Sequence, residues 1–224
     1  INNTSMGKKT LVVVNATTMM PHALEPFKGE ESAFALVLSN ALNLPGPPDI
    51  VVLAVEDLPG TESVRTMTAG VWTARGVIES IIGLCGEDDY DAVFHIHADA
   101  PFIDIGLSGK MYLNHHRYMA EYTFADGYPQ GLTPEIVSPS ILTRLLSLCK
   151  GDEPLLHRLS LFDIVKNDIN AFDIETELSP VDMRMLRVSL HADSRANLLL
   201  LRRIMEKTKG ERADSERIIS ILKE

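Results

Sequence analysis

The chain has 224 residues, of which 45% are hydrophobic and 23% are charged, a balance that is ordinary for a soluble globular protein with its own core. Its formal net charge of −10 argues against general electrostatic attraction to nucleic acid or anionic lipid, so we expect neither as a partner, although a small nucleotide responds only to local charge. No apolar run reaches the roughly 18–20 residues that a membrane span needs, and no signal peptide is evident, which predicts a cytoplasmic protein.

We expect a single domain over residues 1–224, because no linker, repeat or low-complexity segment divides the chain. Residues 1–5 precede a natural-looking start at Met6, so we expect them to be an expression remnant. Cys85 and Cys149 lie in apolar surroundings, which predicts buried free thiols rather than a disulfide or a metal site.

The hydrophobic pattern predicts strands that alternate with helices. In chain order, we expect a strand at 9–17, a loop at 18–29, a helix at 31–44, a strand at 49–55, a mainly helical stretch at 62–84, a strand at 91–99, a helix at 105–119, short strands at 120–124 and 134–138, helices at 138–149 and 155–167, strands at 172–178 and 185–190, and helices at 194–207 and 215–223. This alternation is typical of βαβ units, so we predict an α/β fold: a three-layer α/β/α sandwich with a mostly parallel, partly mixed sheet.

The strand at 91–99 is the most informative element. Alternation along it sorts the side chains onto two faces, with Val93, His95, His97 and Asp99 on one face and Ala92, Phe94, Ile96 and Ala98 on the other. Ligands of open α/β sheets bind beyond the carboxyl ends of the strands, which is where Asp99 would lie. We therefore expect Asp99 in the functional site.

Three segments resemble nucleotidyltransferases of the cytidylyltransferase type, which make CMP-sugars on a GT-A-like fold. In His97–Ile103, a strand ends in an Asp followed by Pro; 161–165 is similar to a late helix of the family; and 187–199 lies where the family reads Arg-Leu-Thr-Val-Asp. The resemblance implies the nucleotide-diphospho-sugar transferase-like fold and transfer of a cytidylyl group to a sugar. It also implies Mg²⁺ held by Asp99, the catalytic residue, with Asp193 as a second, shifted ligand.

The chain departs from the family in its phosphate-binding parts. The family's glycine-rich, basic loop corresponds to residues 16–28, where Lys28 is the only cation and Glu25 would repel phosphate. The family's second metal-binding Asp falls on His191, and its following Asp falls on Arg195. We therefore expect a divergent member with a degraded loop, and the sequence leaves open whether it is an enzyme.

Four residues are candidate contacts for a nucleotide or nucleotide-sugar. Lys28 is the lysine of the degraded loop, and Arg187 is placed by the resemblance in a late strand near the site. Asp126 and Glu135 flank a Gly- and Pro-containing loop that we expect near the carboxyl edge of the sheet, where it would shape a sugar or peptide pocket.

Residues 120–136 look more specifically like the amino-terminal region of spirochaete SPASM-domain proteins, which are larger and linked to radical-SAM chemistry. This likeness implies that the chain is excised from a longer protein, with the radical-SAM/SPASM region following it as a partner. Cluster-binding cysteines would belong to that region, so we expect no Fe–S cluster in this chain. The alternative function is then a noncatalytic recognition or scaffold module.

A third function class is zinc hydrolysis. His95, His97 and Asp99 lie at i, i+2 and i+4 on one strand face, similar to the His-x-His-x-Asp-His signature of metallo-β-lactamase-like hydrolases. The final His of that signature is Ala100 here. A hydrogen-bonded core histidine is the competing interpretation of His95.

Overall fold

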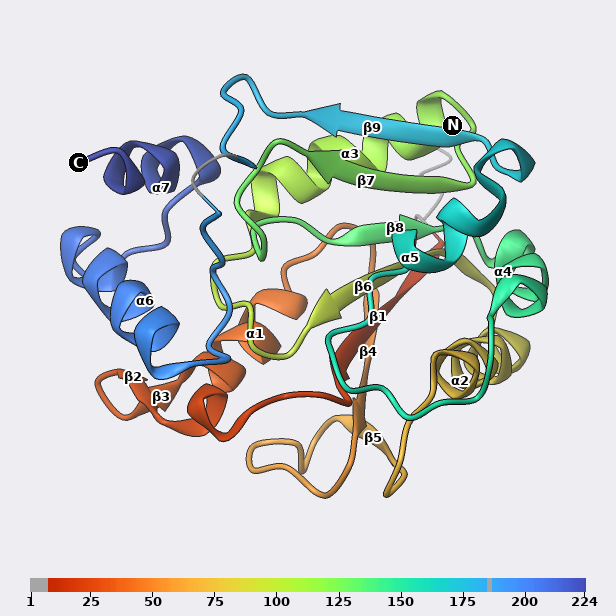
Figure 1. The fold of residues 1–224 in the computed structure, drawn as a ribbon, viewed down its shortest axis with the longest axis horizontal. Coiled ribbons are helices and arrows are strands. Elements are labelled where there is room, and N and C mark those ends of the chain that lie inside the picture. Colours follow the sequence, from red (N-terminus) through yellow and green to blue (C-terminus); the bar gives the residue numbers. More distant parts are fainter. Residues whose placement is uncertain (1–7, 185–186) are drawn as a thin grey trace, which may run out of the picture.

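The computed structural model describes residues 8–184 and 187–224, and a seven-stranded sheet runs through their middle (Figure 1). The strands follow the order β5-β4-β1-β6-β8-β7-β9. Their bounds are β1 (Lys9–Ala16), β4 (Pro48–Ala54), β5 (Arg65–Thr68), β6 (Tyr90–His97), β7 (Tyr122–Asp126), β8 (Glu135–Val137) and β9 (Ile174–Leu178). Only β8 runs antiparallel to its neighbours β6 and β7. The prediction of a mostly parallel, partly mixed sheet is confirmed.

Helices cover both faces of the sheet. They are α1 (Ala33–Ala41), α2 (Ala74–Glu87), α3 (Ile105–Arg117), α4 (Leu142–Leu148), α5 (Phe162–Val165), α6 (Arg195–Lys207) and α7 (Ser215–Leu222). Shorter pieces are the 3₁₀ turns η1 (Pro21–Leu24), η2 (Pro139–Ile141) and η3 (Lys166–Ala171), and the strand pair β2 (Pro26–Lys28) and β3 (Glu31–Ser32). Among the described residues, no helix has the length and apolar composition that crossing a membrane requires.

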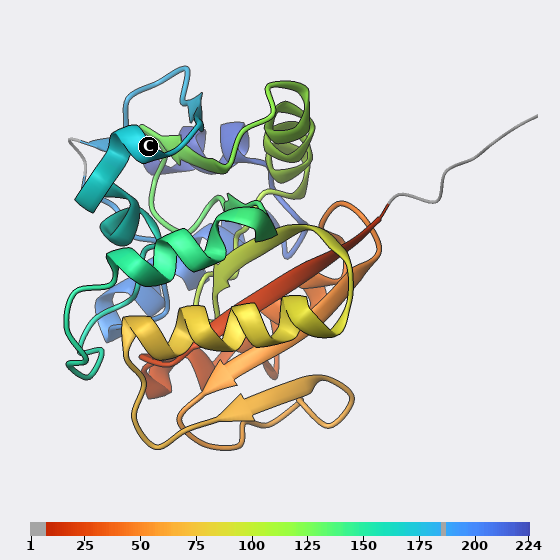
Figure 2. The same cartoon turned by 90° about the vertical axis from the view of Figure 1, so that its right-hand side faces the viewer.

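Two apolar clusters, one on each face of the sheet, form the main core. The face of β1 that carries Leu11 and Val13 packs against α2 and α4, which lie side by side in Figure 2. The opposite face, with Val12 and Val14, packs against α1 and α3. A third cluster joins α6 and α7 to Phe27 of β2 at one end of the molecule. Because strand side chains alternate, one buried strand supplies both main clusters.

The two-face prediction for the strand before Asp99 is confirmed. Val93 belongs to the α2 side, whereas Phe94 and Ile96 belong to the α1 side. The regular part of β6 ends at His97, and Asp99 lies in the turn that follows.

The sequence predicts a mainly helical stretch at 62–84, but the structure is helical only from Ala74 onward. It contains β5, which pairs in parallel with β4, and α2 begins only after Thr73, whose side chain accepts a hydrogen bond from the Gly76 N–H. As an edge strand with half-exposed residues, β5 lacks the apolar run that would have revealed it.

The predicted helix at 155–167 is wrong over its first half. Residues 150–161, here called the strap, contain no helix or strand, and α5 begins at Phe162. The strap is held from outside itself: the Leu155 N–H donates to the Trp72 carbonyl at 2.8 Å, and the Leu161 N–H donates to the Glu135 carboxylate at 3.0 Å. These tertiary hydrogen bonds replace the local ones that a helix would have made.

The predicted strand at 185–190 lies partly outside the described residues. Within the described part, Ser189 forms an isolated parallel bridge with Gln130, and this bridge does not extend into a strand. The remaining predicted elements are present with shifted ends; for example, α1 starts two residues late because the Ser32 side chain caps it by accepting from the Ala35 N–H.

Candidate functional site

Asp99 lies just beyond the carboxyl end of β6 and is only 3% exposed. The turn that carries it is held by two neighbours: the Ala98 N–H donates to the Asn15 carbonyl at 3.0 Å, and the Asp99 carbonyl accepts from the Ala192 N–H at 2.8 Å. The second bond draws the segment before α6 across the end of the sheet. Residues that are nearly a hundred positions apart therefore meet at this turn.

Arg158 of the strap joins the two predicted metal ligands. Its Nη2 donates to Asp99 Oδ2 at 2.6 Å and to Asp193 Oδ2 at 3.1 Å. Asp193 also accepts a hydrogen bond from Asn197 Nδ2 at 2.7 Å. Asp99 and Asp193, the two ligands that the resemblance implies, thus lie together with a guanidinium between them.

Charge pairing keeps Arg158 and Asp193 ionised. Burial by itself would raise the pKa of Asp193, but the hydrogen bonds from Asn197 and Arg158 hold it below its usual range. Burial would likewise lower the pKa of Arg158, yet its contacts with Asp99 and Asp193 raise it. At neutral pH, Arg158 and Asp193 form an ion pair beside the buried Asp99.

Two neutral histidines border this cluster. The rings of His97 and His191 lie 5.6 Å apart, edge to face. Burial lowers the pKa of His191 to about 4 and that of His97 well below its ordinary value. His191 Nδ1 bonds Ser189 Oγ at 2.9 Å, whereas its buried Nε2 has no partner among the described residues. An orphaned buried nitrogen is unusual and marks a place where a ligand or water would be stabilised.

The hydrogen bonds around His95 determine which of its ring nitrogens carries the proton. The Thr17 N–H donates to Asn15 Oδ1 at 3.0 Å, which leaves Asn15 Nδ2 to donate to His95 Nε2, also at 3.0 Å. Since Nε2 is then the acceptor, Nδ1 carries the proton and points at Glu135 Oε2, 3.1 Å away. The interpretation of His95 as a hydrogen-bonded core histidine agrees with this network.

The Glu135 carboxylate fastens the strap and the start of α5 to the sheet. It accepts hydrogen bonds from five groups: Tyr122 Oη at 2.6 Å, Ser160 Oγ at 2.9 Å, the Phe162 N–H at 2.9 Å, the Leu161 N–H at 3.0 Å and His95 Nδ1 at 3.1 Å. A carboxylate offers about four lone-pair sites, so these donors occupy all the acceptor sites of Glu135. Burial would raise the pKa of Glu135, but these hydrogen bonds, first that from His95, keep it lowered.

A zinc ion fits this arrangement poorly. Within the described part of the chain, the ligand atoms of His95, His97 and Glu135 lie within 4.8 Å of one another. The third ligand predicted from the sequence, Asp99, is instead paired with Arg158. Zinc at the histidines would require Glu135 to give up hydrogen bonds to the strap and His95 to give up its Nδ1 proton.

A pocket of about 390 Å³ opens beside these groups. Its polar part includes His97, Arg158 and His191. Its wall is aromatic and includes Phe124 and Phe162, whose rings lie 4.9 Å apart. The pocket combines stacking surface with hydrogen-bond donors, a pattern typical of small-ligand sites.

The other predicted contacts are spread around and beyond this pocket. Asp126 and Arg187 line an adjoining pocket of about 440 Å³, where the Asp126 carboxylate accepts from Arg184 Nη1 at 3.3 Å. Lys28 lies on β2 and lines a separate pocket near Gly210. Their roles in substrate binding stay predictions.

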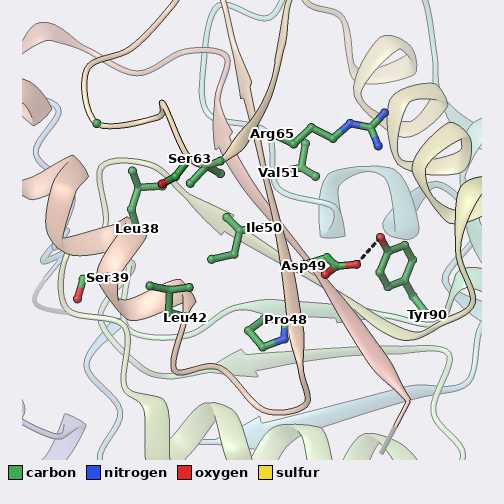
Figure 3. A pocket seen from close by; sticks show the side chains of 12 residues that line it. Leu38, Ser39, Leu42, Pro48, Asp49, Ile50, Val51, Ser63, Arg65 and Tyr90 are labelled. Carbon is green, nitrogen blue, oxygen red and sulfur yellow. Dashed lines mark hydrogen bonds between the residues drawn. The ribbon is translucent and has the colours of Figure 1, made fainter.

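A larger pocket, of about 530 Å³, lies elsewhere, between α1, the edge strand β5 and its neighbour β4 (Figure 3). Its charged groups are engaged with one another or with neighbours: the Asp49 carboxylate accepts from Tyr90 Oη at 3.0 Å and from Lys9 Nζ at 3.2 Å. It opens near the amino end of β4, at the opposite end of the sheet from Asp99. We therefore place the functional site at the smaller pocket.

Sequence reasoning missed Arg158, because the pattern around it predicted a helix. It named His191 only as the position of a lost Asp, without its place beside His97. Neither residue has a local motif, and both reach the site through long-range hydrogen bonds of their segments.

The comparisons with known proteins agree with the fold. No protein-family model matches the chain. An uncharacterized protein of Treponema pallidum is 48% identical over 137 residues, 54% of this chain and 63% of that protein, so the chain spans less than two thirds of this relative. Among solved structures, a cytidylyltransferase from Leptospira borgpetersenii has a TM-score of 0.76 at 17% identity, covering 96% of this chain and 94% of its own. The structure of a CMP:2-keto-3-deoxy-manno-octonic acid synthetase complexed with CTP has a TM-score of 0.61 at 12% identity, covering 89% and 99%.

The chain thus has the nucleotide-diphospho-sugar transferase-like fold found in cytidylyltransferases. At these identities the likeness establishes the fold and not the reaction.

Proposed function

We propose that the pocket beside Asp99 binds a nucleotide or a nucleotide-sugar, as a divergent nucleotidyltransferase-like domain. The observation that carries this proposal is the meeting of three distant segments at the carboxyl end of the parallel strands, where Arg158, which lines the pocket, bonds both Asp99 and Asp193. Ligands of open α/β sheets bind at this end. The synthetase of the same fold that was solved with CTP supports the choice of ligand class.

The pocket's chemistry suits such a ligand. The wall with Phe124 and Phe162 offers a flat apolar surface for a base or sugar ring. Arg158 and the unpartnered His191 Nε2 offer polar contacts at its floor. Neutral His191 can donate or accept there, depending on its tautomer.

The Mg²⁺ that the resemblance implies does not fit the side chains as they stand. Asp99 and Asp193 are the residues that would hold it, and there it would neutralise phosphate charge. Both carboxylates, however, are bonded to the same nitrogen of Arg158. Residues 16–28 supply Lys28 alone to compensate phosphate charge. We therefore propose ligand binding as the primary function and make cytidylyl transfer a question for assay.

A second candidate is a recognition or scaffold module without turnover, within a larger radical-SAM/SPASM protein. The ion pair that fills the space between Asp99 and Asp193 favours it, since a site built for nucleotidyl transfer would keep these carboxylates available.

A thermal-shift panel tests the proposal. CTP, ATP, GTP and UTP are each added with Mg²⁺ or with EDTA. A ligand at 100 times its Kd stabilises by about 2.7 kcal/mol, which moves a domain of this size by several degrees. We expect a shift with CTP that Asp99→Asn removes and that the matched change Asp49→Asn, in the pocket of Figure 3, leaves intact.

Pyrophosphate release in the same mixtures separates the two candidates. Release with CTP and a sugar acceptor would establish transfer, and a CTP shift without release would favour the recognition module. Flat melting curves with all four nucleotides would refute nucleotide binding.

A further inference from the structure

Arg158 lies where a divalent ion would have to bind if Asp99 and Asp193 were to share it. We infer that Arg158 is the resident cation of this site: its guanidinium takes the place of a metal ion and excludes divalent ions from the two carboxylates. The inference rests on the proposed function for identifying this pocket as the ligand site. It concerns the cation preference of the site, which the overall fold does not determine.

The distances make the two cations mutually exclusive. One nitrogen, Arg158 Nη2, lies 2.6 Å from Asp99 Oδ2 and 3.1 Å from Asp193 Oδ2. Mg²⁺ would need oxygens at about 2.0–2.1 Å, in the same space between the carboxylates. An ion there would also meet the positive charge of the guanidinium at contact distance, a strong repulsion in a partly buried site. Metal can bind only after Arg158 leaves.

The backbone on both sides of Arg158 is anchored. Leu159 and Leu161 are buried, at 6% and 1% exposure, and the Leu161 N–H is held by Glu135. Upstream, the Leu155 N–H is held by the Trp72 carbonyl. Departure of Arg158 therefore requires a swing of its side chain into the pocket. That swing would leave the buried Asp99 without its counter-charge, which is costly.

The remaining N–H groups of Arg158 are available to a ligand. Asp99 and Asp193 bond only its Nη2, and Nη1 and Nε have no hydrogen-bond partner among the described residues. Arg158 lines the pocket together with His191, whose Nε2 is also unpartnered. The site thus offers a ligand the N–H donors of Arg158 where a metal-dependent site would present an ion.

Mn²⁺ binding, followed by electron paramagnetic resonance without nucleotide, tests the inference. In the wild type, we expect weak binding that Asp99→Asn changes by less than twofold. Arg158→Gln should free both carboxylates and tighten Mn²⁺ binding at least tenfold, equal to about 1.4 kcal/mol. Asp99→Asn in the Arg158→Gln background should abolish that gain.

Two controls isolate the charge. Arg158→Lys keeps a cation and should bind Mn²⁺ as weakly as the wild type. Arg144→Gln removes an arginine that also bonds a carboxylate, Glu121 at 3.0 Å, and should change nothing. Melting curves confirm that each variant is folded, and Arg158→Met replaces Arg158→Gln if the latter is not.

Wild-type Mn²⁺ binding that is as tight as in Arg158→Gln and is lost in Asp99→Asn would overturn the inference, because Arg158 would then yield to metal. Equal, weak binding in the wild type and in the folded neutral variants would overturn it too. Neither result depends on a nucleotide, so failure of the inference is distinguishable from flat nucleotide melting curves, which would refute the proposed function.

Discussion

Removal of the Glu135 carboxylate should destabilise the protein strongly and release the strap. Glu135→Ala removes an acceptor from five donors, among them the backbone N–H groups of Leu161 and Phe162, the latter keeping only a longer contact with Ser160 Oγ at 3.3 Å. Those two N–H groups cannot reorient, whereas the Ser160 hydroxyl can turn to another acceptor. The loss therefore concentrates at the junction of the strap and α5.

The magnitude follows from this count. A buried donor left unpaired costs about 1–3 kcal/mol. The Glu135 side chain is 14% exposed at the pocket, so water can reach part of the gap and the five costs do not add in full. We expect a loss of about 3–5 kcal/mol, well below the sum of five such costs. Against a typical stability of about 5–15 kcal/mol, the variant would be marginally folded.

Urea unfolding followed by fluorescence of Trp72 measures the loss, since this buried residue is the single tryptophan of the chain. Glu135→Gln keeps one carbonyl acceptor and should fall between the wild type and Glu135→Ala. The matched control is Glu87→Ala, which breaks an exposed pair with Arg65 and should cost far less. Trypsin should cut Glu135→Ala faster than the wild type after Lys150 in the strap.

If Glu135→Ala and Glu87→Ala unfold at the same urea concentration, and trypsin cuts the strap equally fast in both, this prediction is wrong. Glu135 would then line the pocket without stabilising the strap.

Two further predictions concern the buried His115 and Gly131, a glycine that lines the pocket. Burial lowers the pKa of His115 to about 4. Between pH 6.5 and 4 the unfolded chain therefore binds a proton at this residue that the folded protein excludes. The free energy of unfolding should fall by up to about 3 kcal/mol as the pH drops through this window. His115→Gln should flatten that decline in urea titrations, and an unchanged slope would contradict it. Gly131 and Gly60 both have positive φ, +94° and +80°, but a Cβ at Gly131 would lie 3.0 Å from the Leu190 carbonyl oxygen and one at Gly60 would meet nothing within 4 Å. Gly131→Ala should therefore lose about 1 kcal/mol more stability than Gly60→Ala, and equal losses would show that the backbone, rather than the contact, sets the cost.

The layered fold was predictable because its signals are local. The continuous apolar run of β1 indicated burial on both faces, and both faces of this strand do pack against helices. Alternation in β6 assigned its residues to the correct faces for the same reason. β5 was not predicted, because a half-exposed edge strand needs no apolar run and its pairing with β4 is a long-range interaction.

The site was predictable only in part. Asp99 followed from the rule that ligands bind beyond strand ends, and Asp193 from the family resemblance; the structure brings both together. The sequence assigns Arg158 to a helix, and its contacts with both carboxylates depend on how Glu135 holds the strap. Lys28, expected at the site from its position in the loop, lies on β2 and lines a different pocket.

The α/β class, the two faces of the central strands and the position of Asp99 could be read from residue periodicity and from which residue follows a buried strand. The charge that stands beside Asp99 depends on long-range packing instead. A segment with helical character is an extended strap because the hydrogen bonds that its N–H groups donate to Trp72 and Glu135 outweigh its local preference. That outcome brought Arg158 to two carboxylates 59 and 35 positions away, a contact that no spacing in the sequence encodes.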